Sequence, residues 1–161
     1  MNNLARSLTL LGRNSHLSSV ICRSLATETG LPLTFACPAK SFYNGVHVKQ
    51  VDVPSYSGDL GILPQHVPTF AVLKPGILIV HEEAGKQEKY FVSSGTVTVN
   101  PDSSCQVLAE EAVPVSELDA KACKDELAAA QREMSGASGA AHAEAQIRVE
   151  TLEAALAAAQ A

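Results

Sequence analysis

The composition of the chain changes abruptly near residue 114, and this change constrains the fold more than any other feature. All eight prolines and all seven aromatic residues lie at or before Pro114. From Ser116 to Ala161, sixteen of 46 residues are alanine and only Val149 is a valine. Because aromatic and β-branched residues favour strands whereas alanine favours helices, the pattern predicts two domains that meet at residues 113–115.

The part before residue 114 has the pattern of short strands separated by turns. The expected strands are residues 31–36, 46–48, 51–53, 76–81, 89–93, 96–99 and 105–109. The alternation of 46–48 and 51–53 is out of phase across Lys49 and Gln50, which predicts a β-bulge. Ser94-Gly95 lies between two strands and predicts a hairpin. Several short strands at this spacing predict an antiparallel β-sandwich or a flattened barrel, assigned to residues 28–114.

Residues 115–161 have the pattern of two antiparallel helices. Ser116 to Asp119 has the form of a capping box, with Ser116 as the residue that caps the first helix. Apolar positions recur on one face of each expected helix, at Ala120, Cys123, Leu127, Ala130 and Met134, and at Ala145, Val149, Leu152, Leu156 and Ala159. Residues 135–140 break the pattern, and Glu144 lies four residues before Arg148, a spacing that predicts an ion pair. The sequence therefore predicts an α+β fold, a sandwich followed by a helical hairpin.

Residues 1–27 differ from the rest because they contain three arginines, five serines and no acidic residue. An acid-poor segment rich in arginine and serine is typical of an organelle transit peptide, and a disordered tail is the alternative. If the leader is removed, nine basic and seventeen acidic residues remain, for a net charge of −8. The leader therefore predicts import into an organelle with a matrix-like compartment.

Charge and motifs exclude several classes of function. The net charge of −5 argues against a nucleic-acid-binding protein, and no apolar run is long enough to span a bilayer. Cys37, Cys105 and Cys123 are odd in number and lack zinc-ligand spacing, so we expect buried thiols and no metal. The sequence contains neither a phosphate-binding loop nor a nucleophile elbow. We therefore predict no active site and no cofactor.

Two segments remain as candidates for binding. Residues 55–61 contain two glycines, two serines and one acid, which predicts a flexible exposed loop that binds rather than catalyses. His66 lies between Pro64 and Pro68, which hold the backbone extended. Its imidazole either faces a partner or packs against the domain, and both alternatives stay open. His81 is expected simply to end a strand.

Several motifs in order resemble the small central-stalk (delta/epsilon) subunits of F-type ATP synthases. The segment GDLGILPQHVP at residues 58–68, followed by LKPG at 73–76, is similar to a run that these subunits share. YFVSSG at 90–95, VNPDSS at 99–104 and VLAEEAV at 107–113 resemble the mitochondrial form, and AEAQIRV at 143–149 extends the likeness into the last helix. The likeness covers about residues 31–156, with gaps between the motifs.

The resemblance implies a ten-strand β-sandwich with a helical hairpin, and a non-catalytic rotor part at the matrix side of the mitochondrial inner membrane. The implied partners are the gamma subunit, the small mitochondrial epsilon subunit and the ring of membrane c subunits. The loop expected to meet the c ring maps onto Ser57, Gly58, Asp59, Leu60, Gly61 and Ile62. His66 matches a histidine on the face used for gamma, and Asp59 is placed to pair with a basic side chain of the ring.

Two other hypotheses belong to different classes. Some relatives bind ATP on the hairpin, which would make the chain a nucleotide-responsive inhibitor of the same motor. Residues 118–123 carry Ala122 where that motif has an arginine, so the guanidinium that would bind phosphate is missing. A free-standing enzyme using His66 or His81 is the third hypothesis, and the absence of a nucleophile counts against it.

Overall fold

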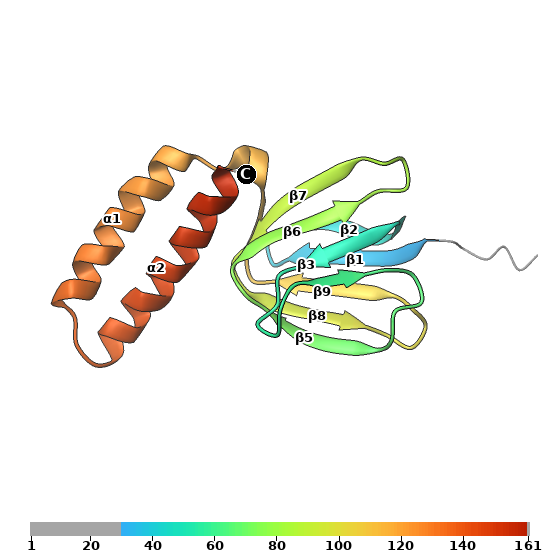
Figure 1. Ribbon diagram of the computed structural model, residues 1–161, viewed down its shortest axis with the longest axis horizontal. Helices are drawn as coiled ribbons and strands as arrows, with labels where there is room; N and C mark the ends of the chain where they lie inside the picture. The colour runs from blue at the N-terminus through green and yellow to red at the C-terminus, as the bar shows by residue number, and fades with distance from the viewer. Residues whose placement is uncertain (1–29, 161) are drawn as a thin grey trace, which may run out of the picture.

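The computed structural model describes residues 30–160, which form a β-sandwich followed by a pair of helices (Figure 1). This arrangement confirms the predicted α+β class. The expected transit peptide, residues 1–27, lies outside the described residues. The strands are β1 (Leu31–Cys37), β2 (Lys40–Val48), β3 (Gln50–Val53), β4 (Leu60–Ile62), β5 (Thr69–Leu73), β6 (Gly76–His81), β7 (Gln87–Val92), β8 (Gly95–Val99), β9 (Cys105–Ala109) and β10 (Ala112–Pro114).

The strands form two five-stranded sheets whose apolar faces share one core. Sheet A has the order β2-β1-β9-β8-β5, and sheet B has the order β10-β7-β6-β3-β4. Neighbouring strands are antiparallel except β1 and β9, which run parallel. Alternate residues of each sheet point into this core, as expected for a sandwich. Phe35 on β1 lies within it, stacked on Phe42 with ring centroids 4.9 Å apart and edge-on to Tyr90 at 5.3 Å.

The phase shift predicted as a bulge near Lys49 has a different cause. β2 ends at Val48 in sheet A, and β3 begins at Gln50 in sheet B, so the chain changes sheets here. Val48 and Val51 both face the core from opposite sides, which breaks the alternation. The prediction of a bulge at Lys49–Gln50 was wrong because alternation reports which side chains are buried, not which strand they pair with.

The hairpin predicted at Ser94-Gly95 was also wrong. β7 belongs to sheet B and β8 belongs to sheet A, so the turn between them carries the chain across the sandwich. Gly95 has φ of 151°, and it lies so close to β9 that a Cβ atom would be 2.2 Å from the carbonyl oxygen of Leu108. The glycine therefore serves close strand packing rather than a hairpin turn.

The two helices pack against each other as an antiparallel pair. They are α1 (Ala120–Gly136) and α2 (Ala140–Ala159), preceded by a short 3₁₀ helix, η1 (Val115–Glu117). Ala130, Ala145 and Val149, which lie on the predicted apolar stripes, are buried. In Figure 1, α2 lies between α1 and the sandwich, so the hairpin touches the sandwich through α2 and η1.

The residue that caps α1 is Asp119 and not the predicted Ser116. The Asp119 carboxylate accepts hydrogen bonds from the backbone N–H groups of Lys121 and Ala122, at 2.8 and 3.3 Å. Ser116 lies in η1, and the extended backbone at Leu118 delays the start of the helix. The capping-box prediction failed because Pro114 and its successors first form a separate turn.

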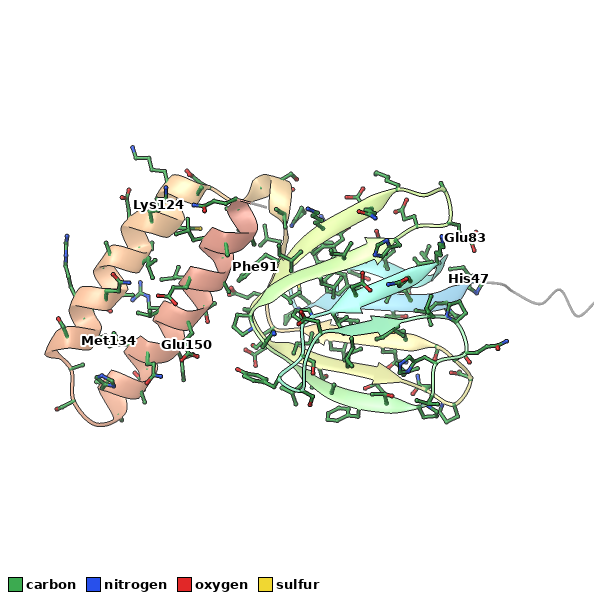
Figure 2. The ribbon with its side chains drawn as sticks, in the orientation of Figure 1. His47, Glu83, Phe91, Lys124, Met134 and Glu150 are labelled. Carbon is green, nitrogen blue, oxygen red and sulfur yellow. The ribbon has the colours of Figure 1, made fainter. Side chains whose placement is uncertain are left out.

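The contact between the hairpin and the sandwich is small. Phe91 of β7 is buried against Ala155 and Ala158 near the end of α2. Figure 2 shows Phe91 on the side of the sandwich that faces the hairpin, and Met134 far from it. Because alanine side chains bury little apolar area, this contact stabilises the docked arrangement much less than the sandwich core stabilises the sheets.

Arg148 joins the two helices through ion pairs. Its guanidinium donates to the carboxylates of Glu126 and Glu133 on α1, at 2.9 and 3.2 Å, and not to Glu144 as predicted. Glu126 and Glu133 are seven residues apart, two turns of α1, so both face the same side of the helix. The predicted ion pair between Glu144 and Arg148 was wrong, because α1 supplies the partners of Arg148.

Replacing Arg148 with alanine is expected to loosen the hairpin. All three charged groups are at least half exposed, so the loss should be only about 0.5–1 kcal/mol. Amide hydrogen exchange should become about two- to fivefold faster in α2 and stay unchanged in the sandwich. Arg132→Ala, which removes an exposed arginine of α1, is the matched control. Equal acceleration by both variants would contradict the role of Arg148 as an interhelical bridge.

Candidate functional site

The outer surface of sheet A carries no charge along four neighbouring strands. β1, β9, β8 and β5 contain no Asp, Glu, Lys or Arg. Because alternate residues of these strands are buried, the others form two rows across the sheet. The rows are Phe70-Thr98-Gln106-Thr34 and Val72-Thr96-Leu108-Ala36, and together we call them the uncharged face.

Hydrophobic side chains on the uncharged face are open to solvent. Phe70 is 67% exposed, Leu108 55% and Val72 48%. Single exposed hydrophobic residues are common, but three on one face without charge are typical of a surface that another protein covers. The sequence contained this signal in the composition of the four strands. It could not be recognised before the strand order placed them side by side.

His66 lies in the loop that leads into β5, at one end of the uncharged face. The backbone pairing of Thr69 with Val99 fixes this position. His66 Nδ1 is 2.8 Å from the carbonyl oxygen of Val67. A carbonyl only accepts, so Nδ1 donates, and in the neutral ring Nε2 is left as an acceptor. Val67 is 69% exposed, which extends the apolar surface around the half-buried imidazole.

The loop at Ser57–Asp59 is anchored at its base and exposed at its tip. The backbone N–H of Gly58 donates to the Ser55 carbonyl, and that of Ser57 donates to the Ser55 hydroxyl, both at 3.0 Å. Ser55 itself is buried and bridges to Leu73 of β5. The Asp59 side chain is 78% exposed and forms an ion pair with Lys74 at 3.1 Å. Specific hydrogen bonds therefore hold the base of the loop, and its tip is exposed as predicted.

The rest of the segment expected to meet the c ring is a strand. Leu60–Ile62 forms β4, the edge strand of sheet B, paired with β3. Ile62 is only 1% exposed and lies in the core, and Leu60 is half-buried. Ile62 was predicted to contact the c ring, but the alternation of β4 turns its side chain into the core, where it cannot form a surface contact. Ser57, Gly58, Asp59 and Gly61 are the exposed members of the set.

The structure does not bring the two candidate regions together. Ser55, at the base of the Ser57–Asp59 loop, lies beside Leu73 at the end of β5. His66 precedes Thr69, at the beginning of the same strand. The exposed loop and His66 therefore lie at opposite ends of β5. Two separate contacts, one at each end, fit this geometry better than a single site.

One part of the outer surface of sheet B carries a polar cluster around His81. His81 Nε2 lies 2.7 Å from the Asp52 carboxylate, which also accepts a hydrogen bond from the Gln50 side chain at 2.5 Å. Gln87 donates to His81 Nδ1 at 3.2 Å. Both ring nitrogens of His81 are thus occupied, and no nucleophile is among these four side chains. His81 ends β6, as expected from the sequence.

The described residues contain no arrangement suited to catalysis. Burial raises the pKa of the Cys105 thiol to about 12, so it is not a thiolate at neutral pH. Burial also raises the pKa of the Tyr43 hydroxyl, with a further contribution from its hydrogen bond to Tyr90. Within residues 30–160 no three His, Cys, Asp or Glu side chains are grouped to hold a metal ion. Neither α1 nor α2 is long and apolar enough to cross a membrane.

The hairpin surface is poorly suited to a nucleotide. The Asp119 carboxylate is engaged by the first turn of α1, and Ala122 offers no side-chain donor. Arg148 is already paired with Glu126 and Glu133. A phosphate that approached this guanidinium would meet two carboxylates, and their repulsion would oppose binding.

A cavity of about 410 Å³ lies between the end of α2 and sheet B, where Ala158, which contacts Phe91, also lines it. Ile77 and Ile79 of β6 line one wall, and Ala154 and Ala158 of α2 line the other. The ion pair between Asp59 and Lys74 lies at the same cavity, so the exposed loop and the hairpin border one space. The continuous apolar run of β6 is typical of a strand that is buried on both faces.

Comparison with known proteins identifies a family. Residues 31–115 match the family model described as ATP synthase, Delta/Epsilon chain, beta-sandwich domain. The chain is 52% identical over 129 residues to "ATP synthase subunit delta, mitochondrial" of Caenorhabditis elegans, covering 80% of this chain and 79% of the relative. It is 38% identical over 149 residues to the protein of the same name from Saccharomyces cerevisiae, covering 92% and 89%.

A solved structure agrees with the sequence comparisons. The fold is similar to a chain in the structure of the Euglena gracilis mitochondrial ATP synthase that contains OSCP, F1 and the c-ring. The TM-score is 0.75 and the sequence identity 28%, and the similarity covers 81% of both chains. The likeness therefore extends over both the sandwich and part of the hairpin, beyond the 85 residues that the family model matches.

Proposed function

The chain belongs to the delta/epsilon chain family of ATP synthases, and from this membership we propose that it is a non-catalytic rotor subunit of the mitochondrial F-type enzyme. It links the gamma subunit to the ring of c subunits and transmits proton-driven rotation of the ring toward ATP synthesis. It also binds the small mitochondrial epsilon subunit. It works at the matrix side of the inner membrane, to which a leader at residues 1–27 directs it.

The observation that best supports this proposal is the uncharged face, which we assign as the surface that binds gamma. Phe70, Val72 and Leu108 supply exposed apolar area, and threonines between them supply hydroxyl groups without charge. His66 at the end of the face offers an acceptor nitrogen in a fixed orientation. A large apolar contact with a polar rim is the usual anatomy of a stable protein interface.

The Ser57–Asp59 loop, with Gly61 beside it, is the proposed contact with the c ring. Its tip is exposed, its base is bonded to the buried Ser55, and Asp59 can pair with a basic side chain of the ring. Torque requires that a connecting part resist deformation. The anchored loop and the shared core of the two sheets supply that stiffness without any residue doing chemistry.

Replacing Asp59 with lysine is expected to uncouple the ring while leaving the fold intact. The new cation would face both Lys74 and the basic group proposed on the ring, which should weaken ring association about tenfold. Because Asp59 is largely exposed, the free energy of unfolding should change by less than about 1 kcal/mol. The measurement is ATP-driven proton pumping per ATP hydrolysed, in vesicles containing enzyme rebuilt with each variant.

Lys74→Ala is the matched control for this experiment. It breaks the same internal ion pair but keeps the negative charge of Asp59 for the ring, so pumping should stay near that of the unaltered enzyme. Normal proton pumping by the Asp59→Lys enzyme would contradict the assignment of this loop as the contact with the c ring. Equal losses in both variants would instead assign the effect to the internal ion pair.

A further inference from the structure

Gln65 is held in a backbone conformation that favours glycine. It has φ of 63°, one of two non-glycine residues with positive φ among residues 30–160. Pro64 precedes it, and the backbone N–H of His66 donates to the Leu63 carbonyl at 3.2 Å, which closes a tight turn. In a turn with proline at the second position and positive φ at the third, glycine is the preferred third residue. A glutamine in that place makes the isolated chain less stable.

Nothing within the described part of the chain compensates for this strain. Gln65 is exposed, and in residues 30–160 its side-chain amide makes no hydrogen bond. The side chain thus contributes neither packing nor a polar contact to the fold. Backbone strain that the fold does not require is characteristic of functional positions.

The position of Gln65 indicates that the strained turn serves binding. The same turn presents His66, whose ring is fixed by the Val67 carbonyl. Thr69 Oγ1 donates to that carbonyl as well, at 2.9 Å, so the loop is tied to the start of β5. Phe70, the one aromatic residue in the two rows of the uncharged face, is the next residue of the strand. Gln65 therefore stands at the rim of the proposed gamma interface, beside its one imidazole acceptor.

We propose that Gln65 is a specificity-determining contact of this interface, an assignment that rests on the proposed function. The partner surface carries an apolar strip that covers Phe70 and two polar groups at its edge. One group donates to His66 Nε2, and the other exchanges hydrogen bonds with the Gln65 amide, which can both donate and accept. Because Gln65 is exposed and its amide has no hydrogen bond within residues 30–160, the amide is available to the partner.

Three variants test this assignment. Gln65→Gly removes both the strain and the amide, and Gln65→Ala removes the amide but keeps the strain. Ser103→Gly is the matched control, because Ser103 also has positive φ, of 66°, in the turn that follows β8. The measurements are the thermal unfolding midpoint of the isolated chain and its affinity for a gamma-containing F1 assembly depleted of this subunit.

Both glycine variants should raise the unfolding midpoint, because each relieves a strained residue. Both Gln65 variants should bind the F1 assembly about five- to tenfold more weakly, as expected for the loss of one hydrogen-bonded contact, and Ser103→Gly should bind normally. If the unaltered chain binds and both Gln65 variants bind equally well, the assignment of Gln65 is overturned while the gamma interface stands. If the unaltered chain does not bind at all, the proposed interface itself is overturned.

Discussion

Replacing Gly95 with alanine is expected to destabilise the chain by at least about 3 kcal/mol. The added Cβ would lie 2.2 Å from the Leu108 carbonyl oxygen and 2.8 Å from the Ala109 Cα, both backbone atoms of β9. Backbone atoms inside a sheet cannot move aside as a flexible side chain can. Relief would require β8 and β9 to separate, which would break the pairing of two central strands of sheet A.

Gly85→Ala is the matched control, because it measures the cost of alanine at positive φ without the steric clash that the added Cβ causes at residue 95. Gly85 also has positive φ, of 82°, but a Cβ there would meet no atom within 4 Å. Its replacement should cost only about 1 kcal/mol, the usual penalty for alanine in the left-handed region. The comparison is made by urea unfolding of both variants. A Gly95→Ala protein no less stable than Gly85→Ala would contradict the described approach of β8 to β9.

Replacing Phe70 with aspartate is expected to prevent incorporation of the chain into the F1 assembly. Large aromatic side chains at the centre of an interface commonly contribute 2 kcal/mol or more to binding, so affinity should fall about 100-fold or further. A carboxylate would also lose its hydration against an apolar partner surface. Because Phe70 is 67% exposed in the isolated chain, the sandwich should fold normally.

Ile147→Asp is the matched control for Phe70. Ile147 is 65% exposed, nearly the same as Phe70, but it lies on α2 and outside the uncharged face. The test compares the binding of both variants to gamma-containing F1 depleted of this subunit, with circular dichroism as the check of folding. Strong binding by a folded Phe70→Asp protein would place the gamma contact elsewhere. Equal weakening by both variants would indicate a general effect of added charge.

The general architecture was predictable because composition and periodicity act locally. The switch from β-branched and aromatic residues to alanine near Pro114 marked the change from strands to helices. Of the predicted apolar stripes, Ala130, Ala145 and Val149 are buried, whereas the buried Ala155 and Ala158 lie off the predicted stripe of α2. Strand pairing was not predictable in the same way. Lys49 and Gly95 both carry the chain from one sheet to the other, and a two-residue period contains no information about partners.

The candidate surfaces were only partly predictable for the same reason. The exposed tip at Asp59 followed from the glycines and serines around it. The turn at residues 63–66 did not, because Pro64 and Pro68 predicted an extended backbone around His66. The partners of Arg148 on α1 depend on how two helices meet, which spacing along α2 cannot report. The positive φ of Gln65 runs against its residue type, so a sequence pattern favours another conformation there.

The proposed role as a rotor part requires that the chain be a stable member of the assembled enzyme. Native electrophoresis of gently solubilised mitochondrial membranes, with an antibody against this chain and a stain for ATP hydrolysis in the same lanes, measures that membership. We expect the chain to migrate with the complex that hydrolyses ATP. If it migrates only as a small free protein while the ATP-hydrolysing complex lacks it, the chain is not a stable part of the rotor.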